Sequence, residues 1–319
     1  MKQPLIILTG PTAVGKTALS INLAKALHGE IISADSMQVY RHMDIGSAKI
    51  TKEEMDGVPH HLIDVLEPWE EFNVTRFQSM AKKAMEEIYS RNHVPIVTGG
   101  TGFYIQALAY DIDFTENEDH SEIRAELEAL MEEKGETFLH QMLEDIDPES
   151  AKAIHANNRK RVIRAIEYYR LTGEKISEHN KREREKQSPY DLYYYVLNRD
   201  RATLYERIDQ RVDLMMEQGL VHEVEGLKAM GCTRDMVAMQ GLGYKEILDY
   251  LDGKCSLEEA VYIIKRDTRH FAKRQLTWFK REKDVRFLEA EQFGSDSEKL
   301  LKFICDDYFG GREKEHGTE

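Results

Sequence analysis

Short apolar runs alternate with longer amphipathic stretches over the first third of the chain. The pattern predicts, in chain order, a strand over 5–8, a helix over 18–27, a strand over 30–34, a helix over 75–91 and a strand over 94–98. Strands and helices that alternate in this way form a parallel sheet with helices on both faces. Sites in such sheets lie at the carboxyl ends of the strands. We therefore expect the loops that follow the three strands to converge.

The pattern changes after residue 111 to polar, helical segments. Ser121 can cap a helix over 122–134, and Asn157 or Asn158 can cap a second helix that ends before Gly173. Neither segment shows the short apolar runs of the sheet. This part of the chain is therefore expected to be helical.

We interpret residues 114–187 as a helical insertion domain and residues 1–113 and 188–319 as the catalytic core. The composition of 310–319 predicts a disordered tail. Ser256 and Glu259 form a capping-box pattern at the start of the last long helix. The strand and helices predicted for the second part of the core are 190–197, 202–218, 220–230 and 257–281.

A phosphate-binding motif directly follows the first strand. The sequence GPTAVGKT at 10–17 matches the G-x-x-x-x-G-K-[ST] loop at every fixed position. In such a loop, backbone N–H groups and a helix N-terminus bind phosphate oxygens, the lysine supplies a cation, and the hydroxyl ligates Mg²⁺. We expect Thr17 to be the Mg²⁺ ligand. The residues predicted to bind a diphosphate or triphosphate are Gly10, Pro11, Thr12, Ala13, Val14, Gly15, Lys16 and Thr17.

No carboxylate stands at the end of the strand over 94–98, where most P-loop NTPases have one to hold Mg²⁺ and orient the nucleophile. The nearest acid in a converging loop is Asp35. Either Asp35 serves both the metal and the nucleophile, or the reaction is not ATP hydrolysis; a turn or cap residue is the structural alternative. Thr101 lies among glycines in the third loop, where it can donate a hydrogen bond to a leaving oxygen or cap a helix.

Composition favours a soluble, cytoplasmic protein. Charged residues make up 32% of the 319 positions, no run approaches the roughly 18 apolar residues of a membrane span, and the N-terminus lacks a signal-peptide pattern. The three cysteines are far apart, so we expect reduced thiols rather than disulfides or a zinc site. His60 and His61 are adjacent and have no suitably spaced third ligand, which favours a structural role.

The net charge of −14 conceals an uneven distribution. Residues 111–149 contain fifteen acidic and two basic residues, 159–186 contain ten basic and five acidic, and 265–286 contain nine basic and three acidic. A solvated face is the ordinary explanation of a basic helix. Two such helices can also bind a nucleic-acid backbone. The last long helix combines Trp278 with a stripe of cations, namely Arg266, Arg269, Lys273 and Lys280.

Taken together, the motifs resemble the tRNA dimethylallyltransferase (tRNA isopentenyltransferase) family. The phosphate loop is generic, but the segments around Asp35, His60 and Lys273 are specific in combination. Ser47 departs from the expected Thr, and no zinc-finger tail follows, so the bacterial type is the closer match. The matching segments are GPTAVGKT (10–17), SADSMQVYR (33–41), DIGSAK (44–49), VPHHLID (58–64), GGTG (99–102), RAIE (164–167), RIDQRVD (207–213), QGLGYK (240–245) and KRQLTW (273–278).

The resemblance implies an α/β fold, with a P-loop NTPase-like parallel sheet flanked by helices and a helical insertion domain. It implies transfer of a dimethylallyl group from dimethylallyl diphosphate to N6 of the adenosine 3′ of the tRNA anticodon. The phosphate loop would then hold an allylic diphosphate, whose electrophile is a carbon. Asp35 would take the N6 proton, Thr101 would contact the bridging oxygen, and Lys16, Arg211 and Thr17 with Mg²⁺ would neutralise the diphosphate.

The resemblance also implies contacts with the tRNA anticodon stem-loop along the chain. A loop base is read most easily when it leaves its stack, and Ser36 and Gln38 are placed to contact it. We expect a monomer. The residues assigned to tRNA binding are Asp35, Ser36, Met37, Gln38, Thr101, Lys160, Arg161, Val162, Ile163, Arg164, Gln240, Gly241, Leu242, Gly243, Tyr244, Lys245, Lys273, Arg274, Gln275, Trp278 and Lys280.

Three other functions fit parts of the pattern. A P-loop small-molecule kinase and a free-adenine-nucleotide isopentenyltransferase both use a phosphate loop, but neither requires the long helical insertion and the basic C-terminal helix. A non-catalytic RNA-binding protein does not require Lys16, Thr17 and Asp35 together. Transfer to tRNA accounts for all of these features.

Overall fold

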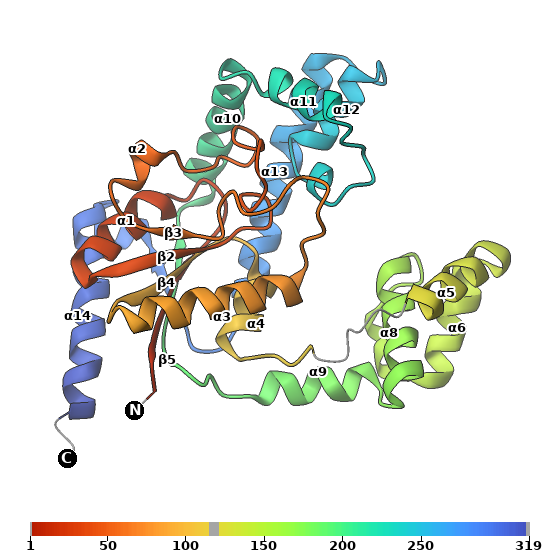
Figure 1. The fold of residues 1–319 in the computed structure, drawn as a ribbon, viewed down its shortest axis with the longest axis horizontal. Helices are drawn as coiled ribbons and strands as arrows, with labels where there is room; N and C mark the ends of the chain where they lie inside the picture. The colour runs from red at the N-terminus through yellow and green to blue at the C-terminus, as the bar shows by residue number, and fades with distance from the viewer. Residues whose placement is uncertain (1, 115–120, 317–319) are drawn as a thin grey trace. The chain divides into compact units, whose positions relative to one another are not determined.

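The computed structural model describes residues 2–114 and 121–316, and the chain divides into two compact units (Figure 1). The larger unit comprises Met1–Ala109 and Pro189–Glu319. Its centre is a six-stranded, all-parallel sheet in the order β3-β2-β4-β1-β5-β6. The strands are β1 Pro4–Thr9, β2 Gly29–Ala34, β3 His60–His61, β4 Val94–Gly99, β5 Asp191–Asn198 and β6 Val285–Glu289.

The register of the central strands brings three loops to one edge of the sheet. Gly99, the last residue of β4, pairs with Thr9 of β1 and with Ala34 of β2. The Thr9 hydroxyl also donates a 2.7 Å hydrogen bond to the Gly99 carbonyl. The chain therefore leaves these strands side by side, and the loops that follow β1, β2 and β4 converge as the strand pattern predicted.

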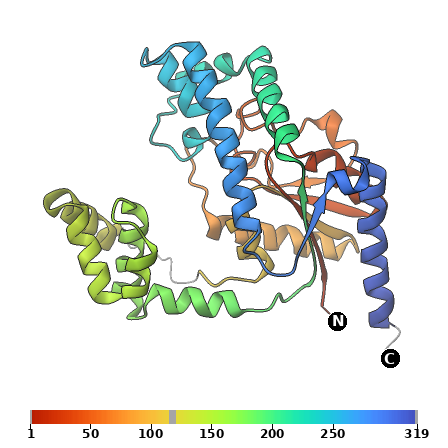
Figure 2. The same cartoon turned by 180° about the vertical axis from the view of Figure 1, so that it is seen from behind.

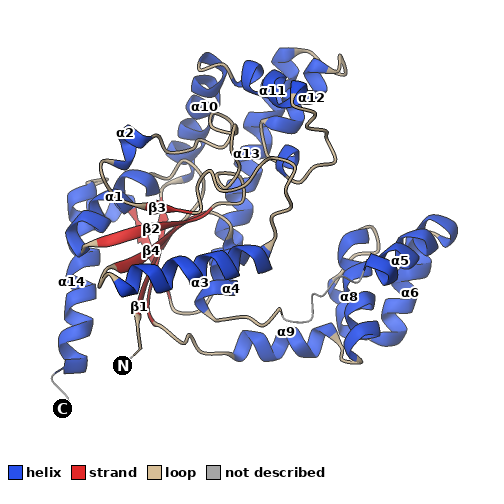
Figure 3. Ribbon diagram, viewed as in Figure 1, coloured by secondary structure: helices blue, strands red, loops and turns tan. Residues whose placement is uncertain are grey.

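Helices cover both faces of the sheet (Figures 2 and 3). On one face, Ile6 and Leu8 of β1 pack with Leu23 of α1 and Ile304 of α14. Alternate side chains point to the opposite face, which α3 covers with Phe77 and its other buried residues. The helices of this unit are α1 Lys16–Leu27, α2 Lys52–Met55, α3 Val74–Ser90, α4 Gly102–Ala109, α10 Arg201–Glu217, α11 Leu220–Ala229, α12 Tyr244–Leu251, α13 Leu257–Phe279 and α14 Ser297–His316, with short 3₁₀ helices at Ala238–Gln240 and Ala290–Phe293.

The smaller unit, Tyr110–Ser188, is helical and has a core of its own. Leu127, Leu139, Leu143 and Ile166 are wholly buried against one another in this core. No strand occurs within residues 110–114 and 121–188. The sequence-based boundaries were 114–187. The helices are α5 Ser121–Lys134, α6 Glu136–Ile146, α7 Pro148–Ala153, α8 Arg159–Thr172 and α9 Ile176–Glu185.

Every strand and helix predicted from the sequence is present, with its ends within two residues. The α/β fold class is confirmed. Two local predictions were wrong. Asn158 precedes α8 but its side chain makes no capping hydrogen bond, whereas Gly173 ends the helix in the left-handed conformation as expected. The tail from 310 to 316 continues α14, because the preceding turns pack on α1 through Leu300 and Tyr308; residues 317–319 lie outside the described part.

Candidate active site

The loop between β1 and α1 has the backbone conformation of a phosphate cradle. Gly10 and Gly15 have φ angles of 146° and 110°, and Ala13 has a φ of 63°. A Cβ at Gly10 would lie 2.2 Å from the Leu197 carbonyl oxygen, so only glycine fits there. α1 begins at Lys16. The phosphate loop therefore leads directly into the N-terminus of α1. Backbone N–H groups at such a position bind phosphate oxygens.

Lys16 is folded back onto its own loop. Its ammonium donates to the carbonyl oxygens of Gly10, at 2.9 Å, and Pro11, at 2.8 Å. Loss of hydration and the nearby Arg211 guanidinium lower the pKa of Lys16 to about 7, although the Asp35 carboxylate acts in the opposite direction. A cation held in this way is available to an anion that displaces the carbonyl oxygens.

Helix α10 places two arginines beside the phosphate loop. Arg207 Nε donates to the Ala13 carbonyl oxygen at 2.9 Å, and an Arg211 N–H lies 3.5 Å from the Thr12 hydroxyl oxygen. Burial and the Arg207 charge lower the pKa of Arg211. Of these two arginines, only Arg211 was predicted to have a role. The spacing of four residues, one helical turn apart, is the signal that could have identified Arg207.

Asp35 is the first residue after β2. Its Oδ1 atom accepts hydrogen bonds from the backbone N–H of Met37, at 2.8 Å, and of Gln38, at 3.4 Å. Oδ2 makes no hydrogen bond within residues 2–114 and 121–316. The carboxylate therefore stabilises its own turn, as the structural alternative predicted, and still presents one oxygen for chemistry. Its charge acts on Lys16 and Arg211, which places these three groups in one electrostatic cluster.

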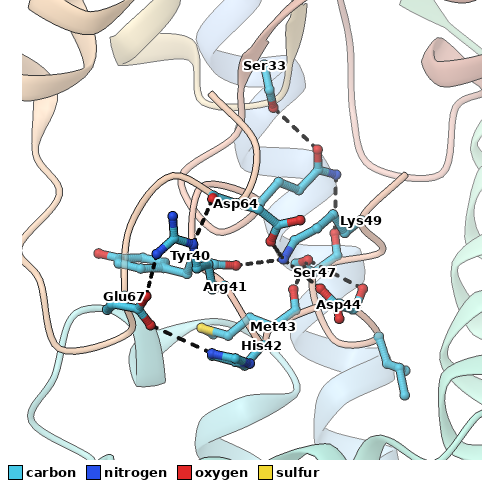
Figure 4. Close-up of polar contacts among 12 residues, drawn as sticks. Ser33, Tyr40, Arg41, His42, Met43, Asp44, Ser47, Lys49, Asp64 and Glu67 are labelled. Carbon is cyan, nitrogen blue, oxygen red and sulfur yellow. Dashed lines mark hydrogen bonds and ion pairs between the residues drawn. The ribbon is translucent and has the colours of Figure 1, made fainter. Parts of the chain in front are cut away.

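The segment that follows Asp35 is fixed by internal hydrogen bonds (Figure 4). Gln38 accepts from the Ser33 hydroxyl at 3.3 Å and donates to the Ala48 carbonyl oxygen at 3.2 Å. Lys49, whose side chain is 4% exposed, donates to the Tyr40 carbonyl oxygen and to two carboxylates, those of Asp44 and Asp64. The oxygen and the nitrogen of the Gln38 amide therefore both form hydrogen bonds within the protein, to Ser33 and Ala48.

Thr101 stands where β4 gives way to α4. Its N–H donates to the Ala34 carbonyl oxygen at 3.2 Å, and its carbonyl accepts from the N–H groups of Tyr104 and Ile105. Its hydroxyl makes no hydrogen bond with any residue the structure describes. Thr101 therefore begins the helix, the structural alternative, and also leaves a hydroxyl beside the Asp35 loop. A Cβ at the neighbouring Gly102 would lie 2.3 Å from the Trp278 indole, so glycine lets α13 approach.

Helix α13 carries a cationic cavity of about 380 Å³ on its exposed side. Of the predicted tRNA-binding residues, Lys273, Arg274 and Trp278 line it, together with Arg281, which sequence analysis did not single out. The stripe predicted on this helix is only partly available, because Arg269 is bound by both carboxylate oxygens of Asp209, at 2.6 and 2.7 Å. The cavity is lined by His270, Lys273, Arg274, Thr277, Trp278 and Arg281.

A second set of contacts joins the Asp35 segment to α11 and α12. The Glu223 carboxylate accepts from three consecutive backbone N–H groups, 44–46, and from the Tyr244 hydroxyl at 2.9 Å. Gly46 lies against the Tyr244 ring, and Gly241 lies against the Met37 sulfur. Glu223 was not predicted to be functional, because a glutamate on an amphipathic helix carries no local signal of such a contact.

Several predicted tRNA-binding residues have buried side chains. Tyr244 and Val162 are 0% exposed and Ile163 is 6% exposed. The neighbouring polar residues Lys160, Arg161, Gln240 and Lys245 are not buried.

The two adjacent histidines have structural contacts. His61 Nε2 lies 2.7 Å from a Glu30 carboxylate oxygen, and His60 Nδ1 lies 2.8 Å from the Val58 carbonyl oxygen. Burial alone would raise the pKa of Glu30, but hydrogen bonds from Arg91, His61 and His93 lower it to about 2. Within the described residues, no group of three or more His, Cys, Asp or Glu is arranged to hold a metal ion. The expected structural role agrees with these contacts.

The described helices include none long and apolar enough to cross a membrane. The three cysteines are free thiols, as expected from their spacing.

Comparisons with known proteins extend over nearly the whole chain. The family model named IPP transferase matches residues 38–282, and the one named isopentenyl transferase matches residues 3–65. A tRNA dimethylallyltransferase of Lachnoclostridium phytofermentans is 63% identical over 302 residues, which are 95% of this chain and 96% of that protein.

Solved structures of similar proteins agree. The full-length tRNA isopentenylpyrophosphate transferase of Bacillus halodurans has 45% identity and a TM-score of 0.74, covering 99% of this chain and 100% of that one. A eukaryotic dimethylallyltransferase acting on tRNA has 30% identity and a TM-score of 0.84, covering 97% of this chain and 80% of that one. The chain therefore belongs to the IPP transferase family, as its motifs predicted.

Proposed function

We propose that this protein transfers a dimethylallyl group from dimethylallyl diphosphate to N6 of the adenosine 3′ of the anticodon in tRNA. The observation that carries the proposal is the convergence of the phosphate loop with the Asp35 and Thr101 loops, through the pairing of Gly99 with Thr9 and Ala34. The names of the similar proteins support the same reaction. A phosphate loop with a base and a hydroxyl at one sheet edge suits displacement at a carbon that bears a diphosphate.

In the proposed reaction, the N6 amine attacks the allylic carbon. A C–N bond forms, the C–O bond to the diphosphate breaks, and the electron pair leaves on the bridging oxygen. The N6 proton passes to the free oxygen of Asp35, while the Thr101 hydroxyl donates a hydrogen bond to the departing oxygen. Lys16 and Arg211, both half-buried, stabilise the diphosphate anion electrostatically.

Mg²⁺ fits the phosphate loop as a cofactor. The Thr17 hydroxyl lies in the first turn of α1, is exposed, and makes no hydrogen bond within residues 2–114 and 121–316. A hydroxyl oxygen suits this hard cation, which ordinarily keeps several waters and takes further ligands from substrate phosphates. When bound, the ion neutralises charge on the diphosphate.

We infer that tRNA approaches the cationic cavity of α13. Lys273, Arg274 and Arg281 supply positive charge for backbone phosphates, and Trp278 supplies an aromatic surface. The catalytic groups proposed above all come from one chain, which supports a monomer, and a tRNA substrate suits a cytoplasmic enzyme.

One experiment separates the candidate functions. The protein is incubated with Mg²⁺ and labelled dimethylallyl diphosphate, in parallel with unmodified tRNA and with AMP. Label in tRNA at the adenosine 3′ of the anticodon is the expected result. Label in AMP alone identifies a free-nucleotide enzyme, and label in neither acceptor rejects the proposal.

A further inference from the structure

The buried face of α13 presents one polar side chain to the active-site loops. Gln275 is 6% exposed. Its Oε1 atom accepts a 3.0 Å hydrogen bond from the Thr12 N–H, in the phosphate loop. Its Nε2 atom donates a 2.9 Å hydrogen bond to the Gly100 carbonyl oxygen, one residue before Thr101. A single amide therefore spans the two loops, and it uses its acceptor on one and its donor on the other.

The backbone is shaped to admit this amide. A Cβ at Gly100 would lie 2.1 Å from Gln275 Nε2, closer than a real contact allows. The sheet itself holds β1 and β4 together only as far as Thr9 and Gly99. The strand pairing ends at these residues, and the Gln275 amide bonds both loops just beyond them.

We propose that Gln275 is a positioning residue for the transfer reaction, setting the distance between the phosphate loop and the Thr101 loop. This inference rests on the proposed function. The diphosphate sits on one loop while its bridging oxygen must face the Thr101 hydroxyl on the other, so an error in their spacing misaligns the leaving group. A misplacement of about 1 Å costs on the order of 10²-fold in rate.

The chemistry of the amide is specific. A methionine has similar length but neither donates nor accepts as an amide does, and a glutamate accepts from Thr12 but donates to Gly100 only when protonated. The tRNA-binding role expected for Gln275 from the family resemblance differs from this one, because a side chain that is buried and bonded at both ends is not directed to a large partner.

The test compares Gln275→Met and Gln275→Glu with the parent and with Gln210→Met. Gln210 is an exposed glutamine on α10 that bonds only Glu206 of its own helix, so its variant controls for the substitution. At saturating substrates, Gln275→Met should lower kcat on the order of 10²-fold, with tRNA affinity unchanged. The rate of Gln275→Glu relative to the parent should rise as the pH falls, because the protonated carboxyl regains the donor; the relative rate of Gln275→Met should stay flat.

A folded Gln275→Met variant with kcat within twofold of the parent overturns the proposal. So does a loss confined to tRNA affinity, which would make Gln275 a tRNA contact. If the parent itself transfers nothing, the proposed function fails, and inorganic diphosphate binding then decides the role of Gln275. Gln275→Met removes the hydrogen bond from the Thr12 N–H, so it should weaken diphosphate binding roughly fivefold, the contribution of one hydrogen bond. An unchanged diphosphate affinity contradicts the proposed role of Gln275. If Gln275→Met does not fold, the pH dependence of Gln275→Glu tests the proposal. A transfer rate relative to the parent that does not change with pH then counts against it.

Discussion

The core unit and the insertion unit use their charges in different ways. In the core, Lys16, Arg207 and Arg211 contact backbone or hydroxyl oxygens of the phosphate loop. In the insertion, Arg159 and Arg170 of α8 contact carboxylates: Arg159 pairs with acids of α5 and α6, and Arg170 pairs with Glu126 of α5. The cations beside the phosphate loop are thus available for an anionic ligand, and many of those in the insertion neutralise their own domain.

This difference limits what a count of charges along the sequence can predict. The insertion was divided into an acidic part and a basic part, and the basic part was expected to attract a polyanion. The fold brings the two parts together, so that Glu167, although buried, is held by Arg124 and Arg164. Burial alone would raise the pKa of Glu167, but these arginines lower it. Charges that are distant in sequence cancel in space.

The largest effect expected is on Asp35, in the core. Asp35→Asn removes the group that accepts the N6 proton but keeps a similar shape, so transfer should fall on the order of 10²- to 10⁴-fold while tRNA affinity is preserved. The measurement is single-turnover transfer with tRNA binding followed separately. Asp145→Asn, at an exposed position of the insertion, is the matched control. Unchanged turnover in Asp35→Asn, or an equal loss in Asp145→Asn, contradicts the assignment.

Lys16 should couple diphosphate binding to a proton. Its pKa is about 7 without ligand, and a bound anion favours the charged form, which raises that pKa. Below pH 7 the amine already carries its proton, whereas above pH 7 binding must take one up. Affinity for inorganic diphosphate should therefore fall as the pH rises above 7, by up to about tenfold per pH unit for one proton.

Calorimetry in buffers of different ionisation enthalpy counts the protons taken up. Above pH 7, Lys16→Ala should bind the diphosphate more weakly, lose up to one proton from the count, and transfer more slowly, on the order of 10²-fold. The diphosphate's own titration is common to the two proteins and cancels in the difference. Equal proton uptake by parent and Lys16→Ala would show that Lys16 does not titrate on binding.

The cations of the cavity on α13 and the turn after it should make a smaller, salt-dependent contribution. Lys273 and Arg281 line the cavity and form no ion pair within the described residues, so replacing both with alanine should weaken tRNA binding roughly tenfold and reduce the salt slope by about two. Arg269→Ala is the control on the same helix, because Arg269 is already bound to Asp209. Identical slopes for the parent and the double variant would make Lys273 and Arg281 part of a solvated face.

The sequence predicted the elements well because their signals are local. An apolar run such as β1, or a glycine after α8, determines its own conformation. The phosphate loop, Asp35 and Thr101 could be placed at one edge because parallel strands end together. The family resemblance added the tRNA contacts, which periodicity alone does not provide.

Contacts between distant segments could not be predicted in the same way. Nothing near Glu223 indicates that it binds the N–H groups of 44–46, and nothing near Gln275 indicates that it reaches Thr12. Tyr244 was expected to contact tRNA, yet its pKa is raised well above the usual range because it is buried beside Glu223. A motif gives the identity of a residue, whereas tertiary packing decides which way its side chain faces.

The smallest effect is expected in the insertion unit. Lys160 and Arg161 are exposed and form no ion pair within the described residues, in contrast to Arg159 and Arg170 on the same helix. Lys160→Ala with Arg161→Ala should reduce tRNA affinity roughly threefold and the salt slope by about one, and Arg159→Ala with Arg170→Ala should change the slope less. Hydrogen exchange gives a second measurement: tRNA should protect 159–170 and leave 121–134 unchanged. Equal protection of the two segments would mean that tRNA displaces the internal ion pairs, and so would a larger change in the salt slope for Arg159→Ala with Arg170→Ala. The contrast between the two units would then hold only for the free protein.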